Sequence, residues 1–422
     1  MKRLYIKLET LASLSIRADH AAMGVNATNY IAGNTLLGSL AAAHRLSYPD
    51  KKGEFEQFFL QEYILYPNLY PAFINSDSGE WQETHLPVYP VPKTAQSCKR
   101  CSGFLHPKNE TNDAHGVRDT LIDWALFKLG MKTDRGERKF EPLDALLAHK
   151  RCPVCKEPMD SFGDYYRRGN TSREIIATNT AVTHLQTRIG VDRESRTARE
   201  GISYNLQVFE EGTIFWGEIK VLDDQLVNVF KNFVADVGAA GLLRMGTGRT
   251  RGMGKVKIEI IESTEEMQRH TTNFIARMQS FNSLLTENMM QKGLEKFLHN
   301  YFFAITLHSP LILNDEFLRY RGTIDANVLE ELLGMHVEGL EQVYQNTSIK
   351  QIMGWQELWG TPRANEYALD TGSVFLFYCK VADSKFIDAL FLLEELGIGK
   401  RRAEGFGRIY LSDPFHKEVV LT

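Results

Sequence analysis

The chain has 422 residues, of which 43% are hydrophobic and 24% are charged, a composition that argues against disorder and allows two or three domains. Its formal net charge is −4, so it lacks the overall basic charge of a dedicated nucleic-acid binder, and any such role must rest on local clusters. Lys7 and Glu9 interrupt the apolar N-terminus, and no apolar run is long enough to cross a bilayer. We therefore expect a cytoplasmic protein with no membrane partner.

A first set of elements runs from the N-terminus to about residue 260. Residues 4–16 alternate like a strand, and residues 29–44 read as a loop that leads into a helix. The β-rich run GTIFWGEIKV at 212–221 is followed by an amphipathic helix and by a glycine-rich loop. Alternating apolar residues after that loop predict a closing strand.

The same order returns further along the chain. Residues 302–313 alternate like a strand, and GSVFLFYCKV at 372–381 repeats the earlier run at an offset of 372 − 212 = 160 residues. A second amphipathic helix, glycine-rich loop and strand follow. We align Gly246-x-Gly248 with Gly397-x-Gly399, and Gly252-x-Gly254 with Gly405-x-Gly407. The repeat predicts an α+β protein with two ferredoxin-like, RRM-like domains of βαββαβ plan.

Two CxxC pairs lie in the first half of the chain. Cys98 and Cys101 form one pair, and Cys152 and Cys155 form the other. Two such turns can complete a tetrahedral zinc site, and four thiolates close the coordination shell, so we expect a structural zinc ion. His106, His115 and His149 are possible substitutes for one cysteine. A pair of disulfides is the less favoured alternative in a reducing compartment.

The domain boundaries follow from these patterns. We expect a first domain over residues 1–262 with the zinc-binding insert at about 90–175, and a second domain over 299–422. A capping box, Ser263-x-x-Glu266, opens a connecting helix over 263–298 that we expect to pack on both domains. The arginine-rich segment 187–199 reads as an extended arm or hairpin, or as a solvated loop.

The glycine loops fit neither the P-loop pattern nor the dinucleotide pattern, but both combine bare backbone with positive charge. Glycine permits close approach, so successive N–H groups can hold a phosphate without reading sequence. The basic candidates are Arg244, Arg249, Arg251, Lys255 and Lys257 in the first loop, and Lys400, Arg401, Arg402 and Arg408 in the second. The alternative is that the glycines only allow close packing of helix and strand.

These features resemble the RAMP superfamily of CRISPR-associated proteins. The resemblance rests on the double ferredoxin-like plan, the C-terminal GIGKRRAEGFGRI, and the segments NYIAGNTLLGSL and RIGVDRESRTAREGISYNLQVFEEGTIFWG. Length and the zinc insert are most similar to the Csx-ten family, Cas-five-like subunits of type III-D effectors. The resemblance implies a CRISPR guide RNA as partner, a polymerase-like large subunit, backbone RAMP subunits, and RNA contacts by Gly246, Gly248, Arg249, Gly252, Gly254, Gly397, Gly399, Arg401, Gly405 and Gly407.

Relatives that cut RNA supply the alternative function. Guide-processing endoribonucleases of the Cas-six type use a histidine near the first helix, where His20 and His44 lie, and backbone RAMP subunits use an aspartate after the first strand, where Asp19 lies. No carboxylate cluster accompanies Asp19. We therefore expect a non-catalytic RNA-binding subunit, with an endoribonuclease using Asp19 or His20 second and a zinc-stabilised protein adaptor third.

Overall fold

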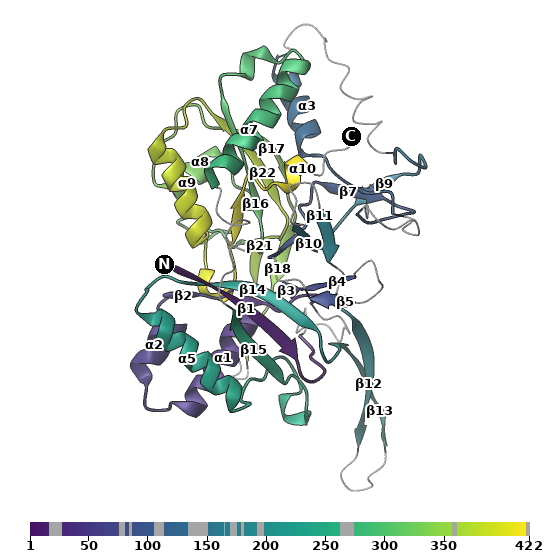
Figure 1. The fold of residues 1–422 in the computed structure, drawn as a ribbon, viewed down its shortest axis with the longest axis vertical. Helices are drawn as coiled ribbons and strands as arrows, with labels where there is room; N and C mark the ends of the chain where they lie inside the picture. Colours follow the sequence, from purple (N-terminus) through teal and green to yellow (C-terminus); the bar gives the residue numbers. More distant parts are fainter. Residues whose placement is uncertain are drawn as a thin grey trace.

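The computed structural model is a mixed α/β fold with antiparallel sheets (Figure 1). It describes residues 1–16, 28–75, 81–83, 87–104, 114–133, 151–163, 165–168, 175–178, 181–191, 198–261, 274–356 and 361–418. In that part of the chain, no helix is both long and apolar enough to cross a membrane.

The first sheet holds the N-terminal strand in its interior. Its order is β15 (Val256–Ile261), β1 (Lys2–Thr10), β14 (Ile214–Val221) and β2 (Ile64–Leu65), and β3 (Tyr70–Pro71) also pairs with β14. Helices α1 (Gly33–Ser47), α2 (Lys52–Phe59) and α5 (Leu226–Ala239) pack on one face of it. Alternation along β1 decides the two faces, since Leu4, Ile6 and Leu8 join the helices in one core while Tyr5 lies in a second cluster on the other face.

The second sheet repeats that arrangement. Its order is β17 (Glu341–Asn346), β22 (Val374–Cys379), β16 (Tyr301–Leu307) and β23 (Ile409–Leu411). In the second sheet the chain runs strand, helix, two strands, helix, strand, with α8 (Ala326–Leu333) and α9 (Ser384–Leu396) as the helices. The first sheet follows the same order, with α2 as an extra helix after α1 and β3 as an extra short strand. Every residue of β22 is buried, because this sheet is covered on both faces.

Helix α7 (Phe274–Gln291) covers the other face of the second sheet. Phe281, Leu285 and Met289 share a core with that sheet and with α3 (Leu121–Thr133) of the insert, while Phe274 and Met278 join the core under α9. The insert belongs to the first expected domain, so these contacts do not contradict the expectation that this helix packs on both domains: in its described part, the buried side chains contact the second sheet and the insert. Ser263 and Glu266 lie outside the described residues.

The insert and its surroundings form small sheets between and beside the two large ones (Figure 1). Strand β10 (Tyr165–Arg168) lies between β6 (Val88–Pro90) and β11 (Ile175–Thr178); β7 (Ala95–Cys98) lies between β8 (Val117–Asp119) and β9 (Met159–Ser161); β4 (Phe73–Asn75) pairs with β5 (Trp81–Glu83). In the second domain β18 (Ile349–Ile352) pairs with β21 (Glu366–Leu369), and β19 (Trp355–Gln356) with β20 (Thr361–Pro362). Short helices are η1 (Arg249–Arg251), η2 (Glu295–Phe297), η3 (Arg402–Glu404) and α10 (Phe415–Glu418).

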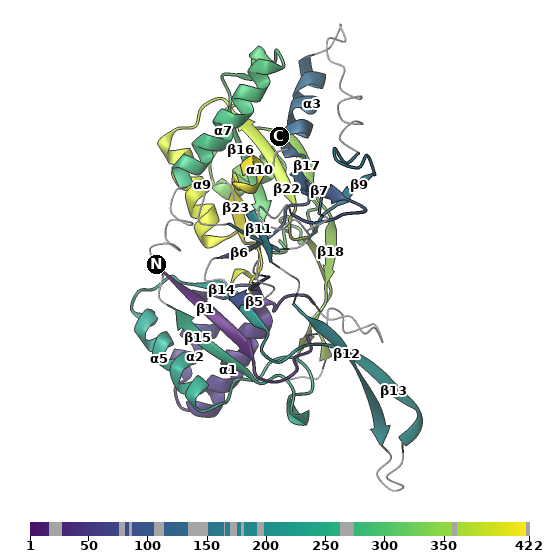
Figure 2. The same cartoon turned by 45° about the vertical axis from the view of Figure 1, so that its right-hand side comes forward.

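A long hairpin projects from the body beside the first domain (Figure 2). It consists of β12 (Thr183–Val191) and β13 (Ala198–Phe209). The sequence alternatives for segment 187–199 are thus resolved in favour of a hairpin arm, at least for the strand residues, because 192–197 lie outside the described part.

Candidate nucleic-acid interface and metal centre

The first glycine loop, residues 242–255, joins α5 to β15 and is folded tightly on its own domain. Its four glycines have φ between +69° and +79°, the left-handed region that favours glycine. A Cβ on Gly246 would lie 2.3 Å from the carbonyl oxygen of Ser15, and one on Gly254 would lie 2.0 Å from that of Met245. Close backbone packing therefore fixes these two glycines. Gly252 differs, because a Cβ there would have no atom of the described residues within 4 Å.

The second glycine loop, residues 397–408, makes the same main-chain hydrogen bonds. Three bonds recur as pairs: Thr247 N–H to Ser15 O and Lys400 N–H to Ile312 O; Gly254 N–H to Ser13 O and Gly407 N–H to Pro310 O; Met245 N–H to Gly254 O and Ile398 N–H to Gly407 O. All of them lie between 2.8 and 3.0 Å. The two loops thus share one backbone design, repeated at an offset of 407 − 254 = 153 residues.

These bonds correct the glycine alignment made from the sequence. Gly246 corresponds to Gly399, and Gly248 corresponds to Arg401, so the pairing of Gly246-x-Gly248 with Gly397-x-Gly399 is wrong by two residues. Arg401 keeps the left-handed conformation of its counterpart, with φ of +59° against +72° for Gly248. The pairing of Gly252-x-Gly254 with Gly405-x-Gly407 fits the hydrogen bonds.

The side chains of the second loop are engaged within the protein. Arg401 pairs with Glu366 and Glu404 and lies 4.6 Å from the centre of the Phe406 ring. Arg402 pairs with Glu62 of the first domain at 2.9 Å. These carboxylates neutralise much of the positive charge that the sequence shows here. Lys400 stays exposed.

The second loop also docks on the first domain through its backbone. The Tyr66 N–H donates to Ala403 O at 3.2 Å. A Cβ on Gly405 would lie 2.8 Å from Asn68 Oδ1 and 3.0 Å from Gly33 Cα, at the start of α1. Gly405 is therefore required by contact between the domains, a reason that the sequence did not reveal.

The first loop presents its charges differently. Arg251 and Lys255 are exposed, and Arg244 and Arg249 are half-buried. No acidic residue occurs between Val237 and Ile258. Ser13, whose carbonyl oxygen holds Gly254, also accepts a 3.1 Å hydrogen bond at Oγ from Gln186 Nε2 of β12. The base of the hairpin arm and the first loop therefore lie side by side.

The candidate catalytic residues divide into described and undescribed ones. Asp19 and His20 lie outside the described residues. His44 is fully buried, with Nε2 3.0 Å from Glu54 Oε1 and its ring among Phe55, Phe58 and Phe233. A role for His44 as a general base is therefore wrong, because its burial keeps a substrate from reaching the ring.

Three cysteines and one histidine converge beside β7. The Sγ atoms of Cys98, Cys152 and Cys155 and a ring nitrogen of His115 all lie within 4.8 Å of one another. Cys98 Sγ is 3.5 Å from Cys155 Sγ, and Cys152 Sγ is 3.3 Å from His115 Nδ1. Main-chain N–H groups of Cys101 and Arg100 lower the pKa of Cys98 to about 6, which favours the thiolate that a metal requires.

This donor set fits a tetrahedral zinc ion. Zn–S bonds of about 2.3 Å and Zn–N bonds of about 2.0 Å place neighbouring ligand atoms roughly 3.5 to 3.8 Å apart, close to the separations of the two pairs. Such a group could hold a metal ion as a Cys₃His site. Zinc would supply a rigid crosslink between β7 and the 152–155 turn.

Cys101 does not belong to the group, which corrects the expected four-cysteine set. Ser97 of β7 pairs with Val117 of β8, and this register brings His115 back beside the end of β7. The His115 N–H donates to Cys101 O at 2.9 Å, so Cys101 contributes its main chain. His115 was one of the substitutes considered from the sequence; His106 and His149 lie outside the described residues.

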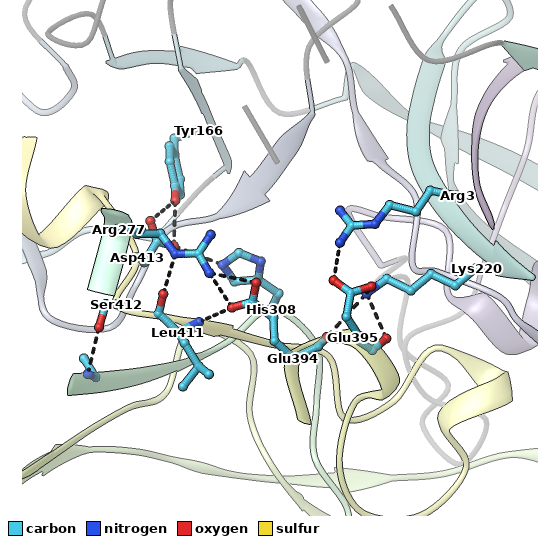
Figure 3. Close-up of polar contacts among 11 residues, drawn as sticks. Arg3, Tyr166, Lys220, Arg277, His308, Glu394, Glu395, Leu411, Ser412 and Asp413 are labelled. Carbon is cyan, nitrogen blue, oxygen red and sulfur yellow. Dashed lines mark hydrogen bonds and ion pairs between the residues drawn. The ribbon is translucent and has the colours of Figure 1, made fainter. Parts of the chain in front are cut away.

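Sequence reasoning missed a buried network of charges between the two domains (Figure 3). Arg3 and Lys220 of the first sheet both pair with Glu395 of α9, and Lys220 Nζ also donates to Glu395 O at 2.8 Å. In the second domain, Arg277 Nη2 pairs with Glu394 at 2.6 Å. Arg3 and Glu395 lie 392 residues apart, so no local pattern could have paired them.

A model of the RAMP superfamily matches residues 7–257, more than half of the chain. No curated protein matches. A chain of a type III-B Cmr-β complex bound to cognate target RNA and AMPPnP is 13% identical with a TM-score of 0.38, over 89% of this chain and 86% of that one. A chain of the Csm3–Csm4 subcomplex from a type III-A CRISPR–Cas interference complex is 11% identical with a TM-score of 0.35, over 88% and 92%.

TM-scores below 0.5 do not assign a subunit to the chain. The superfamily match is different in kind, because it spans the first helices, β14, α5 and the first glycine loop. The chain therefore belongs to the RAMP superfamily.

Proposed function

We propose that this protein is a non-catalytic RNA-binding subunit of a type III CRISPR ribonucleoprotein in antiviral defence. Its two ferredoxin-like domains span residues 1–262 and 299–422, and a structural zinc ion ties the insert together. The observation that carries the proposal is the first glycine loop, which joins exposed cations to an open glycine beside the hairpin arm. The subunit would hold the 5′ end of the guide RNA, as the resemblance to Cas-five-like subunits implies.

The geometry favours the first loop over the second as the RNA contact. Arg251 and Lys255 are exposed, and the loop sequence holds no acid to oppose a phosphate. In the second loop, Arg401 and Arg402 already face carboxylates, so an RNA phosphate would have to compete with Glu62, Glu366 and Glu404. Phosphate contacts of this kind position a strand without selecting its sequence.

The net charge of −4 is compatible with a subunit that binds RNA through one local basic cluster and contacts proteins through the rest of its surface. The resemblance to the Csx-ten family implies a polymerase-like large subunit and backbone RAMP subunits as those protein partners. Arg188 lies on β12 two residues beyond Gln186, which bonds Ser13 beneath the first loop, and adds one half-buried cation at the base of the arm. The RNA path would run from the loop along the base of the arm.

The test compares RNA binding of the full chain and of a loop variant, Arg251→Ala with Lys255→Ala, across salt concentrations. Each RNA phosphate that a cation no longer neutralises lowers the slope of log affinity against log salt by about 0.7 for single strands, so we expect a slope smaller by about 1.4. Arg319→Ala with Lys380→Ala removes two exposed cations elsewhere and is the matched control. Equal slopes for the loop variant and the control would refute the proposed contact.

The same reactions, run on a denaturing gel with and without divalent metal, examine the alternative endoribonuclease. Discrete cleavage that is lost in Asp19→Ala or His20→Ala, with binding retained, would replace the proposal by an RNA-cutting one. Intact RNA in all reactions agrees with a guide-holding subunit. Absence of any RNA binding by the purified chain and by its reconstituted complex would favour the third interpretation, a zinc-stabilised adaptor.

A further inference from the structure

A cleft lies between the two domains, away from both the first glycine loop and the metal centre. Its volume is about 140 Å³, which leaves room for roughly ten water molecules. Strands β1 and β14 form one wall, with Tyr5 and Trp216, and β6 and β23 form the other, with Tyr89 and Tyr410. With Tyr70, five tyrosine and tryptophan rings line the cleft; they suit a planar aromatic group, because stacking on such rings does not depend on the identity of a base.

Three cations and three carboxylates line this cleft, and all but one of the cations pair with a lining carboxylate. Arg3 and Lys220 pair with Glu395, and Figure 3 shows these groups facing one another across the domain boundary. Arg408 also lines the cleft, yet among the described residues it has no carboxylate within ion-pair distance. Its Nη2 donates to Leu65 O at 3.2 Å, while its buried Nη1 has no hydrogen-bond partner in the described part of the chain. A buried guanidinium nitrogen without an acceptor calls for an anion or a polar acceptor.

His308 lies directly across from Arg408 on the sheet. The His308 N–H donates to Arg408 O at 2.8 Å, and opposed residues of an antiparallel pair share one face. His308 Nε2 is 3.0 Å from Asp413 Oδ2, and that buried carboxylate also accepts hydrogen bonds from Tyr166 Oη and the Phe415 N–H. Asp413 is therefore an acceptor, and Nε2 carries the proton.

The orientation of His308 has a consequence for the cleft. With Nε2 bonded to Asp413, Nδ1 is the ring nitrogen left for a ligand, and within the described residues it makes no hydrogen bond. The ring itself stacks on Tyr410, with centroids 4.9 Å apart. A neutral imidazole can accept a hydrogen bond from a base N–H or a ribose hydroxyl through Nδ1, and an imidazolium can donate a hydrogen bond to a phosphate.

We propose that the cleft between the domains binds one nucleotide. The base would stack among Tyr5, Tyr89 and Trp216, since His308 and Arg277 already cover the Tyr410 ring, and Arg408 and His308 would bind its phosphate or the polar edge of its base. The nucleotide can be free or one unit of an RNA strand, and both sources present the same chemistry. The inference extends beyond the proposed function, and only its RNA form rests on that function.

Binding of AMP and UMP to the full chain, measured by calorimetry, tests the free form, with adenosine and inorganic phosphate as partial ligands. Binding of a short single-stranded RNA tests the strand form. We expect Arg408→Gln to weaken the occupied form at least about tenfold, while Arg319→Gln, a charge removal on the surface of the second domain, has no effect. Loss of mononucleotide binding identifies a free ligand, and loss of RNA binding alone identifies a nucleotide within a strand.

Because Arg408 also bonds the first domain, the wild-type chain supplies a second measurement that needs no variant. Photocrosslinking with 4-thiouridine monophosphate, or with RNA carrying 4-thiouridine, is expected to label Tyr5, Tyr89 or Trp216. No mononucleotide binding, unchanged RNA affinity in Arg408→Gln and crosslinks confined to other surfaces would together overturn the proposal. Arg251→Ala with Lys255→Ala distinguishes the two proposals, because it weakens the loop contact and leaves mononucleotide binding in the cleft unchanged.

Discussion

Alanine substitutions at Gly252 and Gly254 form a matched pair that measures why the first loop needs glycine. Both residues have left-handed φ, +79° and +73°, so both substitutions carry a backbone cost of roughly 1–2 kcal/mol. In Gly254→Ala, the new Cβ would also meet Met245 O at 2.0 Å. Backbone must then move by about 1 Å, and such overpacking costs a further 1–3 kcal/mol or so.

We expect Gly254→Ala to lower the free energy of unfolding by about 2–5 kcal/mol, against about 1–2 kcal/mol for Gly252→Ala. Denaturant unfolding followed by circular dichroism measures the difference, with unchanged denaturant slopes as the check that only stability has changed. Equal losses in the two variants would refute the argument from close packing. The same pair separates structure from binding, because Gly252→Ala should keep the fold while its methyl group hinders approach of an RNA phosphate to the open side of the loop.

Four further outcomes follow from the described contacts. Glu395→Gln leaves Arg3 and Lys220 with Glu218 as their remaining shared carboxylate. We expect a loss of about 1–3 kcal/mol in unfolding free energy with faster limited proteolysis between the domains, whereas Glu338→Gln at an exposed pair should change neither. His115→Ala and Cys152→Ser should each abolish bound metal measured by elemental analysis, while Cys101→Ser should retain it, since Cys101 Sγ is outside the ligand group. Gly405→Ala should loosen the contact with Gly33 and Asn68, seen as faster amide exchange at the start of α1, and exchange confined to the second domain would contradict it. Burial lowers the pKa of His416, but the Asp119 carboxylate, 2.8 Å from Nδ1, outweighs that effect and raises it. The stability gained from this pair is therefore complete below about pH 6.5 and is lost as pH rises through the raised pKa. The difference in unfolding free energy between wild type and His416→Gln should shrink at high pH, and a constant difference would contradict this sign.

Much of the framework was readable from local patterns. Alternation of apolar residues along β1 and the 160-residue repeat of β14 and β22 predicted the central strands of both sheets. Such strands are recognisable because apolar residues alternate between their two faces and a glycine precedes each repeated run. The Cys152-x-x-Cys155 turn could be predicted for the same reason, since both candidate ligands come from one short segment. The glycines of both loops indicated that positive φ is permitted there, and the structure shows that they adopt it.

Features that depend on long-range contacts were not readable. His115 takes the place expected for Cys101 in the candidate ligand group because of the register between β7 and β8. The spacing of the cysteines in the sequence does not reveal that register. His44 follows an alanine-rich stretch that resembles a surface helix, yet Phe233 from α5 and the helix α2 bury it. Arg401 pairs with Glu366, and Arg402 pairs with Glu62, which lies 340 residues before it in the sequence. The number of basic residues in the second loop therefore overstated the positive charge available to a ligand.

The two glycine loops show how one backbone design can serve two tasks. Main-chain bonds to Ser15 and to Ile312 hold both loops in the same form, so the difference between them resides in side chains. Where the first loop has Arg251 in a stretch free of acids, the second has Glu404, which pairs with Arg401. That acid, together with Glu62, turns the basic residues of the second loop inward, toward contact between the domains. Replacing Glu404 by glutamine should therefore release Arg401 from one of its two carboxylates and raise the RNA affinity of the second loop, whereas an unchanged affinity would show that docking on the first domain, and not charge pairing, keeps that loop from RNA.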